Sequence, residues 1–388
     1  MRQPPGYYLP TAYVGETVRA FVPNPLPPEP PIEWSASLLS LSQQAMLAIG
    51  RLDGLSVLMP DISQFLYAYI RKEALLSSQI EGTQSSLSEL LLFENEEVPG
   101  VPNDDVIEVS NYVAAMEHGL RRLREGFPLS SRLIREIHGV LLAKGRGSDK
   151  QPGEFRTSQN WIGGTWPGNA RYVPPPHDLV PECMGALEKF MHAERDVASP
   201  LLKAALAHVQ FETIHPFLDG NGRVGRLLTS FLLCHDGVLK QPLLYLSLFL
   251  KQHRPVYYDL LQRARTEGAW EEWLAFFFEG VSATADQAAQ TVARVLKLFQ
   301  ENQLKIATLG STAASTTRIH ELLQRYPMLS VNRALSLMPE PPAFATANAA
   351  FKRLADLGIA EEKTGGARNR VFAYKDYLAI LGEGTEPL

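Results

Sequence analysis

One short stretch near the middle of the chain gathers the groups that phosphate chemistry needs: IHPFLDGNGRVGRLL, residues 214–228. It holds a histidine, a carboxylate, three glycines, an asparagine and two arginines between apolar flanks. Histidine is the side chain whose ordinary pKa lies near neutrality, so His215 is the candidate for removing a proton. A carboxylate beside phosphate groups is the usual ligand of Mg²⁺, and Asp219 fits that role.

Two helices must hold this stretch in place. The letters FETI are typical of a helix end, and VGRLLTSFLL of a new helix. Between them, Gly220 and Gly222 let the backbone turn tightly and expose its N–H groups in front of a helix N-terminus, which favours anions. Arg223 and Arg226, three residues apart, share one helix face and suit a polyphosphate. The pattern predicts transfer of part of a nucleotide to a hydroxyl; a polar loop that only caps two helices is the alternative.

The stretch HPFLDGNGRVGR resembles the signature of the Fic family, H-x-F-x-[DE]-[AG]-N-[GK]-R-x-x-R, at every fixed position. The resemblance continues through PGEFRTSQNWIGG and RYVPPP and covers most of residues 60–300. It implies a mainly α fold, a Fic-type helical bundle with a β-hairpin flap beside the site. It also implies AMPylation, the transfer of AMP from ATP to a Ser, Thr or Tyr hydroxyl of a target protein with release of pyrophosphate.

The resemblance assigns roles by position. His215 would deprotonate the target hydroxyl, and Asp219 would bind the Mg²⁺ that accompanies ATP. Gly220, Asn221 and Gly222 would form an anion hole, Arg223 would hold the α/β-phosphate region and Arg226 the γ-phosphate, with Phe217 as a packing anchor. The full set expected at the nucleotide is Glu81, Phe217, Gly220, Asn221, Gly222, Arg223, Gly225, Arg226, Tyr257 and Tyr258.

A second motif, in LLSSQIEGTQS, predicts self-restraint. Ser77, Glu81 and Gly82 match the family's inhibitory pattern, [ST]-x-x-x-E-[GN]. The resemblance implies that Glu81 pairs with Arg226 and takes the place of the γ-phosphate, so that ATP binds unproductively. An ordinary solvated glutamate near a helix end is the alternative, and support of the reverse reaction, removal of AMP, stays open.

The flap and the surroundings of the site are less specific. SQNWIGG and ARYVPPP predict two short strands, and relatives use the exposed edge of the flap to dock the target. The residues expected there are Ile162, Gly163, Gly164 and Thr165. Tyr257 and Tyr258 lie where relatives place aromatics near adenine, with core packing as the alternative. His208 and Glu212 are expected to pack the helix and support the site, and His138 to be structural.

The chain is expected to fall into three parts: residues 1–100, a proline-rich extended arm and helices with the inhibitory motif; 101–300, the catalytic core; and 301–388, a small winged-helix-like domain of three short helices, a hairpin and a closing helix. Residues 301–388 hold ten Lys/Arg and nine Asp/Glu, a poor footprint for nucleic acid, although Arg368 and Arg370 could lie on a wing. A protein-contact or dimer role is favoured over DNA.

Bulk composition fits this reading. The net charge of −5 excludes a global basic field for nucleic acid or anionic membrane. Cys183 and Cys234 are too few for a disulfide framework, and the apolar runs are too short to span a bilayer. With no apolar run in MRQPPGYYLP, we expect no signal peptide and a cytoplasmic protein. Two alternatives stay open: transfer of another group, such as UMP or phosphocholine, and a nucleotide-sensing DNA-binding regulator. Self-modification also stays open.

Overall fold

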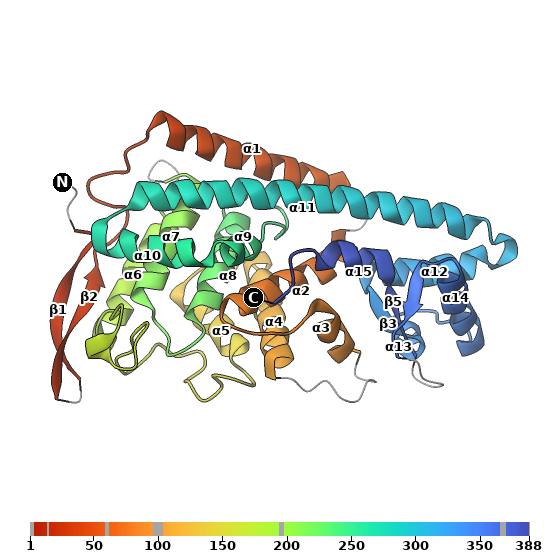
Figure 1. The fold of residues 1–388 in the computed structure, drawn as a ribbon, viewed down its shortest axis with the longest axis horizontal. Helices are drawn as coiled ribbons and strands as arrows, with labels where there is room; N and C mark the ends of the chain where they lie inside the picture. The colour runs from red at the N-terminus through yellow and green to blue at the C-terminus, as the bar shows by residue number, and fades with distance from the viewer. Residues whose placement is uncertain are drawn as a thin grey trace. The chain divides into compact units, whose positions relative to one another are not determined.

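The computed structural model describes residues 4–13, 15–58, 62–95, 104–193, 198–364 and 370–387. Most of the described chain is helical, as predicted (Figure 1). The elements are β1 (Gly6–Tyr13), β2 (Glu16–Pro23), α1 (Ala36–Leu58), α2 (Ile62–Ile80), α3 (Leu87–Phe93), α4 (Asp104–Arg124), α5 (Ser131–Leu141), η1 (Pro167–Asn169), η2 (His177–Leu179), α6 (Val180–Met191), α7 (Pro200–Ile214), α8 (Asn221–His235), α9 (Ser247–Gln252), α10 (Arg254–Glu267), α11 (Trp270–Ala307), η3 (Gly310–Thr312), α12 (Ala313–Arg325), β3 (Met328–Ser330), α13 (Val331–Ser336), α14 (Phe344–Asp356), β4 (Ala360–Glu362), β5 (Val371–Tyr374) and α15 (Lys375–Gly382).

The chain forms two compact units, each discontinuous in sequence. The first comprises residues 1–51 and 111–285, and the second comprises residues 52–110 and 286–388. The boundaries fall inside α1, α4 and α11. Residues 214–228, which we call the histidine stretch, therefore belong to the first unit, and the inhibitory motif belongs to the second. The division into residues 1–100, 101–300 and 301–388 remains a proposal based on sequence.

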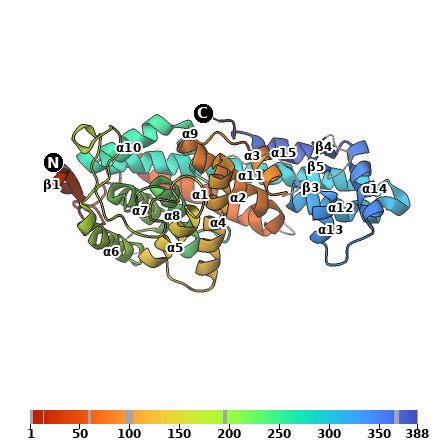
Figure 2. The same cartoon turned by 90° about the horizontal axis from the view of Figure 1, so that it is seen from below.

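The first unit is built around α7 and α8, which pack against each other (Figure 2). Every side chain from Lys203 to Ile214 is buried, so α7 is a core helix rather than an amphipathic surface helix. Neighbouring α6 and α10 cover α7, and α5 packs on α8. Pro200 occupies the first turn of α7, where a missing N–H costs nothing, and Ser199 caps it by accepting from the N–H of Leu202. This packing fixes the two helix ends that carry the histidine stretch.

The proline-rich stretch PNPLPPEPPI, residues 23–32, contains no helix, as expected, and it begins at the end of an antiparallel hairpin formed by β1 and β2. The register pairs Tyr8 with Phe21 and Tyr13 with Glu16. Its alternation of apolar and polar residues was overshadowed by the prolines on either side, and Gly15, at φ +85°, belongs to the connection. Residues 24–35 contain no helix or strand, as their prolines predict.

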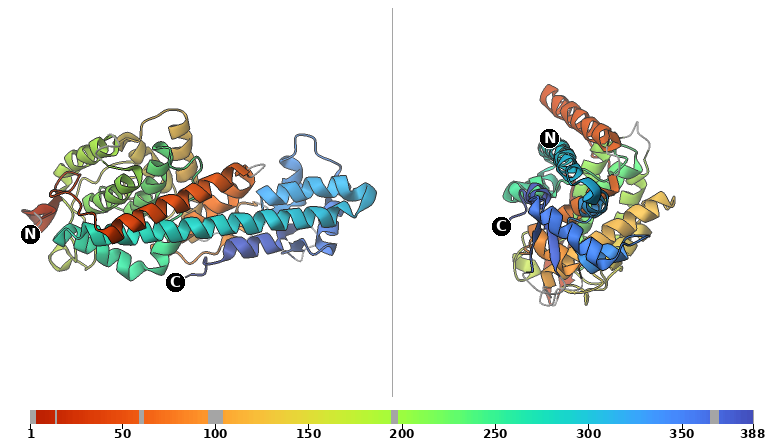
Figure 3. Two further views of the ribbon diagram at one scale, coloured as in Figure 1. Left: turned by 90° about the horizontal axis from the view of Figure 1, so that it is seen from above. Right: turned by 90° about the vertical axis from the view of Figure 1, so that its right-hand side faces the viewer.

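The second unit contains α2 and α3 together with residues 286–387. Its sheet has the antiparallel order β3-β5-β4, and α14 packs on both α12 and α13. These C-terminal elements are the blue part of the ribbon in Figure 3. Three short helices, a hairpin and a closing helix are the elements that the sequence predicted here, and the winged-helix assignment stays a prediction. Arg368 lies outside the described residues, while Arg370 bonds to Asn348 and pairs with Glu362.

None of the helices in the described ranges combines the length and the apolar character that a membrane crossing requires.

Candidate active site

His215 lies at the C-terminal end of α7 in a backbone conformation that few residues adopt. Its φ of 49° and ψ of 60° place it in the left-handed region, where a side chain normally costs energy. Its own N–H still bonds to the carbonyl of Phe211, so the helix ends with this residue. Such strain persists only where neighbouring groups hold the backbone, and it is typical of functional positions.

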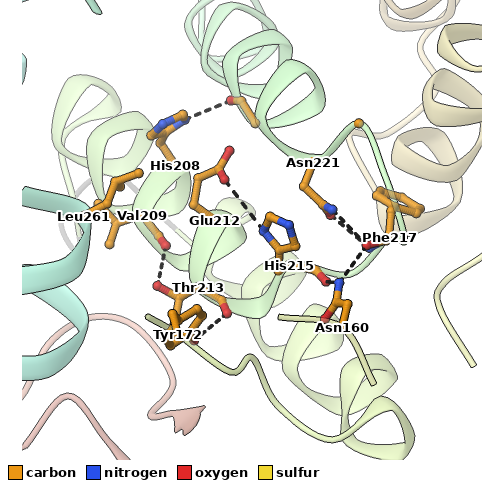
Figure 4. A network of polar contacts seen from close by, with 12 residues as sticks. Asn160, Tyr172, His208, Val209, Glu212, Thr213, His215, Phe217, Asn221 and Leu261 are labelled. Carbon is orange, nitrogen blue, oxygen red and sulfur yellow. Dashed lines mark hydrogen bonds and ion pairs between the residues drawn. The ribbon is translucent and has the colours of Figure 1, made fainter. Parts of the chain in front are cut away.

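Asn221 and Asn160 fix the loop that follows His215 (Figure 4). The Asn221 side chain accepts the N–H of Phe217 at 2.9 Å and donates to the carbonyl of the same residue at 2.8 Å. Asn160 donates to that carbonyl as well, at 3.0 Å. The side chain of Asn221 therefore closes the loop. Its part in the predicted anion hole would fall to its backbone N–H.

Phe217 anchors the loop from within the core, as its predicted role requires. It is fully buried, and its ring stacks on the ring of His138 with centroids 3.7 Å apart. His138 donates from Nε2 to the carbonyl of Asp219 and accepts the N–H of Gly153 at Nδ1. Burial lowers the pKa of His138 to about 4, which keeps the ring neutral and suited to this donor–acceptor pattern. His138 therefore has a structural role, as predicted, because it holds the loop in place.

Arg156 holds the strained end of α7, and the sequence analysis did not single it out. This buried side chain donates to the carbonyls of His215, Ser158 and Pro175 at 3.0, 3.2 and 2.5 Å. The backbone N–H of Arg156 also bonds to the carbonyl of Pro216. A guanidinium with donors in several directions suits this clustering of carbonyls.

On the other side of His215, Glu212 lies one turn back along α7. Its Oε2 is 3.9 Å from Nδ1 of His215, an ion-pair distance when the imidazole is protonated (Figure 4). The same carboxylate occupies the space over Gly225 of α8, because a Cβ on that glycine would come 2.4 Å from Oε1 of Glu212. Gly225 is thus a packing position for Glu212.

His208 and Tyr257 support the same face of α7. His208 donates from Nδ1 to the carbonyl of Gly225 and accepts the hydroxyl of Tyr257 at Nε2, at 3.0 and 2.9 Å. Tyr257 is 1% exposed, a placement that corresponds to the core-packing alternative, whereas Tyr258 is partly exposed. Hydrogen bonds among these buried, neutral groups therefore hold the second turn of α8 against α7.

The N-terminal end of α8 has the open backbone N–H groups and the dipole that favour an anion. The first intrahelical bond runs from Val224 N to Gly220 O, so the N–H groups of 221–223 point out of the helix end, where the helix dipole favours negative charge. Gly220 has φ +75°, which admits this sharp entry. The carboxylate of Asp219 accepts the N–H of Gly220 and lies 3.6 Å from the guanidinium of Arg223. Arg223 and Arg226 are both buried on α8.

The predicted flap is present in a shorter form than expected. Ile162 and Tyr172 form one antiparallel bridge with two backbone hydrogen bonds, and the two strands expected there are absent from the described residues of this segment. Positive φ angles at Gly163 and Gly164 and the 3-10 turn η1 end the ladder after one pair. Gly163, Gly164 and Thr165 are exposed, as a docking edge requires.

The hairpin β1–β2 contacts this flap, and no sequence pattern predicted that contact. The N–H of Phe21 bonds to the carbonyl of Val173, and the indole N–H of Trp166 donates to Glu16 at 2.6 Å. Tyr13 packs edge-on against the rings of Trp161 and Trp166. The hairpin therefore supports the flap through one backbone hydrogen bond, one side-chain hydrogen bond and these ring contacts.

In the second unit, the inhibitory motif lies at the end of α2, as predicted. Ser77 is buried, Glu81 follows the last helical residue, and Gly82 is exposed with φ +102°. The N–H groups of Glu81 and Gly82 bond to the carbonyls of Ser78 and Gln79, which is how a helix ends at a left-handed glycine.

Buried neutral histidines make the fold acid-sensitive. Burial lowers the pKa of His138, His208 and His320 to about 4, below the ordinary 6.5. The unfolded chain therefore binds more protons below pH 6.5, and stability is lost as the pH falls from about 6.5 towards 4. We expect urea unfolding at pH 5 to show a loss of about 2 kcal/mol per histidine relative to pH 7. Equal stability at the two pH values would contradict this.

The first unit thus brings together a histidine at a strained helix end, a carboxylate, two buried arginines and an open helix N-terminus. These are the kinds of group that transfer of a phosphate-containing group requires. Of the residues predicted for the site, Tyr257 lies in the core, and Glu81, Ser77 and Gly82 lie in the other unit. Sequence reasoning missed Arg156 and Asn160, whose side chains bond to loop carbonyls, and the brace provided by Tyr13 and Glu16.

Comparisons with known proteins agree with this site. Residues 39–121 match the family model described as Fic/DOC family N-terminal, and residues 128–233 match the one described as Fic/DOC family. These two stretches carry the likeness of this chain to the Fic/DOC family. The chain is 33% identical over 211 residues to the Protein adenylyltransferase Fic of Culex quinquefasciatus and 32% identical over 211 residues to that of Aedes aegypti. Both alignments cover 53% of this chain and 39% of the relative, so the chain spans about two fifths of the length of these relatives.

The fold has a counterpart among solved structures. A Fic family protein from Desulfovibrio desulfuricans is similar with a TM-score of 0.58 at 21% identity, over 89% of this chain and 98% of that one. This likeness supports the mainly α fold of the chain.

Proposed function

We propose that this chain is a protein adenylyltransferase that transfers AMP from ATP to a Ser, Thr or Tyr hydroxyl and releases pyrophosphate. The single observation that carries the proposal is the loop 215–220, whose bonds hold His215 beside the open N-terminus of α8. The relatives named Protein adenylyltransferase Fic support the same reaction. A nucleotide phosphate held at α8 would face a base fixed at the end of α7.

In the proposed reaction each of these residues has one role. His215 takes the proton of the target hydroxyl, and the hydroxyl oxygen attacks the α-phosphorus. The bond from the α-phosphorus to the bridging oxygen breaks, and pyrophosphate leaves. Negative charge spreads over the phosphate oxygens during this step, so the N–H groups of 221–223 together with Arg223 and Arg226 supply most of the stabilisation.

Magnesium fits the residues present. Asp219 is one-third exposed at the edge of the site, and Mg²⁺ prefers one or two carboxylates together with phosphate oxygens. In the described part of the chain there is no cluster of three or more His, Cys, Asp or Glu that could hold a metal ion. Bound at Asp219, Mg²⁺ would neutralise developing charge on the phosphates. Asp219 would hold it while Gly220 orients the carboxylate.

The enzyme would be restrained by Glu81, whose carboxylate would pair with Arg226 in the place of the γ-phosphate. The support is the motif from Ser77 to Gly82 and its placement at a well-formed helix end. A charge-assisted pair of this kind contributes about 1.5–3 kcal/mol, so its removal should raise AMP transfer about ten- to hundredfold in Glu81→Gly.

The purified protein is incubated with ATP and Mg²⁺, alone and together with a lysate that supplies target proteins. The measurement is the intact mass of the proteins in each sample. Wild type should label slowly and Glu81→Gly quickly, and Glu81→Gln should lie between them because an amide keeps the shape without the charge. Equal labelling of wild type and Glu81→Gly would contradict the restraint. An adduct whose mass differs from AMP would favour another transferred group, and loss of a pre-existing AMP would favour the reverse reaction.

A further inference from the structure

The helix that carries the inhibitory motif is bonded, inside its own unit, to a short segment more than three hundred residues away in sequence. This segment consists of Glu383, Gly384 and Thr385, and we call it the clasp segment. It follows α15, whose Tyr377 and Leu381 are buried, so it leaves a firmly packed helix.

Two side chains of α2 bind the backbone of the clasp segment. Lys72 donates from Nζ to the carbonyl of Glu383 at 2.8 Å, and Gln79 donates from Nε2 to the carbonyl of Thr385 at 2.9 Å. Both side chains are buried, at 5% and 1% exposure, and a buried donor that loses its acceptor is costly. The clasp segment therefore runs along α2 across two turns of the helix.

Gln79 lies between Ser77 and Glu81, which places the second contact inside the motif. Its amide also donates to the carbonyl of Ser85 at 3.1 Å, so one side chain ties the clasp segment to the loop after the helix. The backbone N–H of Gly82 bonds to the carbonyl of Gln79. Movement of Gln79 would thus displace Ile80 and Gly82, the residues on either side of Glu81.

The clasp segment is itself held in place from α11 and by its own turn. Arg294 forms a bidentate pair with Glu383, with both N···O distances at 2.7 Å. Thr385 donates from its hydroxyl and from its N–H to the carbonyl of Gly382. Gly384 has φ +78°, a left-handed conformation that turns the two neighbouring carbonyls towards α2. Burial lowers the pKa of Lys72 to about 8, while Glu383 and Glu386 oppose this effect, so Lys72 carries its charge at pH 7.

From these contacts we propose that the clasp segment regulates the enzyme by holding the end of α2, and with it Glu81, in the restraining position. This inference rests on the proposed function, because Glu81 must be inhibitory for its position to matter. A partner that binds α15 or competes for Arg294 would release the clasp segment and raise the activity. Binding at the C-terminal part of the chain would then control the restraint.

The test uses the full chain with Gly384→Val, since a β-branched residue disfavours a positive φ and should displace the clasp segment. Gly358→Val is the matched control, because Gly358 has a similar φ of +70° in the same unit and its contacts lie at the end of α14. We expect amide hydrogen exchange in residues 77–83 to accelerate about tenfold in Gly384→Val and to stay near wild type in Gly358→Val. Unchanged exchange in residues 77–83 of a folded Gly384→Val protein would overturn the inference.

Activity gives the second readout. AMP transfer by Gly384→Val should rise about tenfold towards the level of Glu81→Gly, and Gly384→Val should add nothing in the Glu81→Gly background. Arg294→Ala should give a smaller rise, with Lys297→Ala as its control on the same helix. An equal rise from Gly384→Val with and without Glu81 would overturn the inference while leaving the transferase proposal intact. If no variant transfers AMP, the proposed function fails, and hydrogen exchange alone still decides whether the segment holds α2.

Discussion

Replacing His215 with alanine in a Glu81→Gly background should lower the rate of AMP transfer about 10²- to 10⁴-fold. That range is what a positioned general base contributes when it removes a proton in the transition state. The structure leads to this expectation because Arg156 and Asn160 both bond to the carbonyl of His215, which fixes the backbone from which the imidazole projects. The measurement is the initial rate of labelling with ATP at saturating Mg²⁺.

Nucleotide binding separates a lost base from a lost site. Affinity for ATP, measured by calorimetry, should change little in His215→Ala, because the proposed phosphate contacts come from α8 and its arginines. Arg226→Ala should weaken ATP binding and transfer together. If His215→Ala retained more than a tenth of the rate, the imidazole would be a packing group and the proposed role would be wrong.

Replacing Arg156 with methionine should lower the free energy of unfolding by about 3–5 kcal/mol and abolish transfer. Methionine keeps much of the apolar stem but leaves the carbonyls of His215, Ser158 and Pro175 without their buried donor. The strained backbone at His215 should then relax. Urea unfolding monitored by circular dichroism measures the loss, and near-neutral pH keeps the buried histidines uncharged.

Arg171→Met is the matched control for Arg156. Arg171 is more than half exposed and lies 3.6 Å from the equally exposed Asp259, a surface pair that contributes little. Its replacement should change stability by no more than about 0.5 kcal/mol. A similar small change in Arg156→Met would mean that the loop holds His215 without this guanidinium.

The sequence predicted that one stretch between two helices carries the candidate catalytic groups, and their catalytic roles stay predictions. His215, Asp219, Arg223 and the glycines lie where two helices meet, and hydrophobic patterning located both helices. Phe217 was expected as an anchor and is fully buried. Gly82 was expected to end its helix, and it follows α2 with a positive φ.

What surrounds this stretch could not be predicted, because it depends on tertiary neighbours. Arg156 acts on three carbonyls from two segments, and nothing local in PGEFRTSQN indicates that it is buried. Tyr257 could face a ligand or the core, and only the packing of α10 on α7 places it against His208. The hairpin β1–β2 was hidden by flanking prolines, and its contact with Trp166 joins residues 150 positions apart.

One experiment tests the central claim most directly. Wild type, Glu81→Gly and Glu81→Gly/His215→Ala are incubated with ATP and Mg²⁺, together with a lysate as a source of target hydroxyls, and all proteins are weighed intact. An added AMP on protein in the Glu81→Gly sample, much less in wild type and none with His215→Ala, is the predicted result. Equal AMP addition with and without His215 would contradict the account, as would a complete absence of adduct from all three samples.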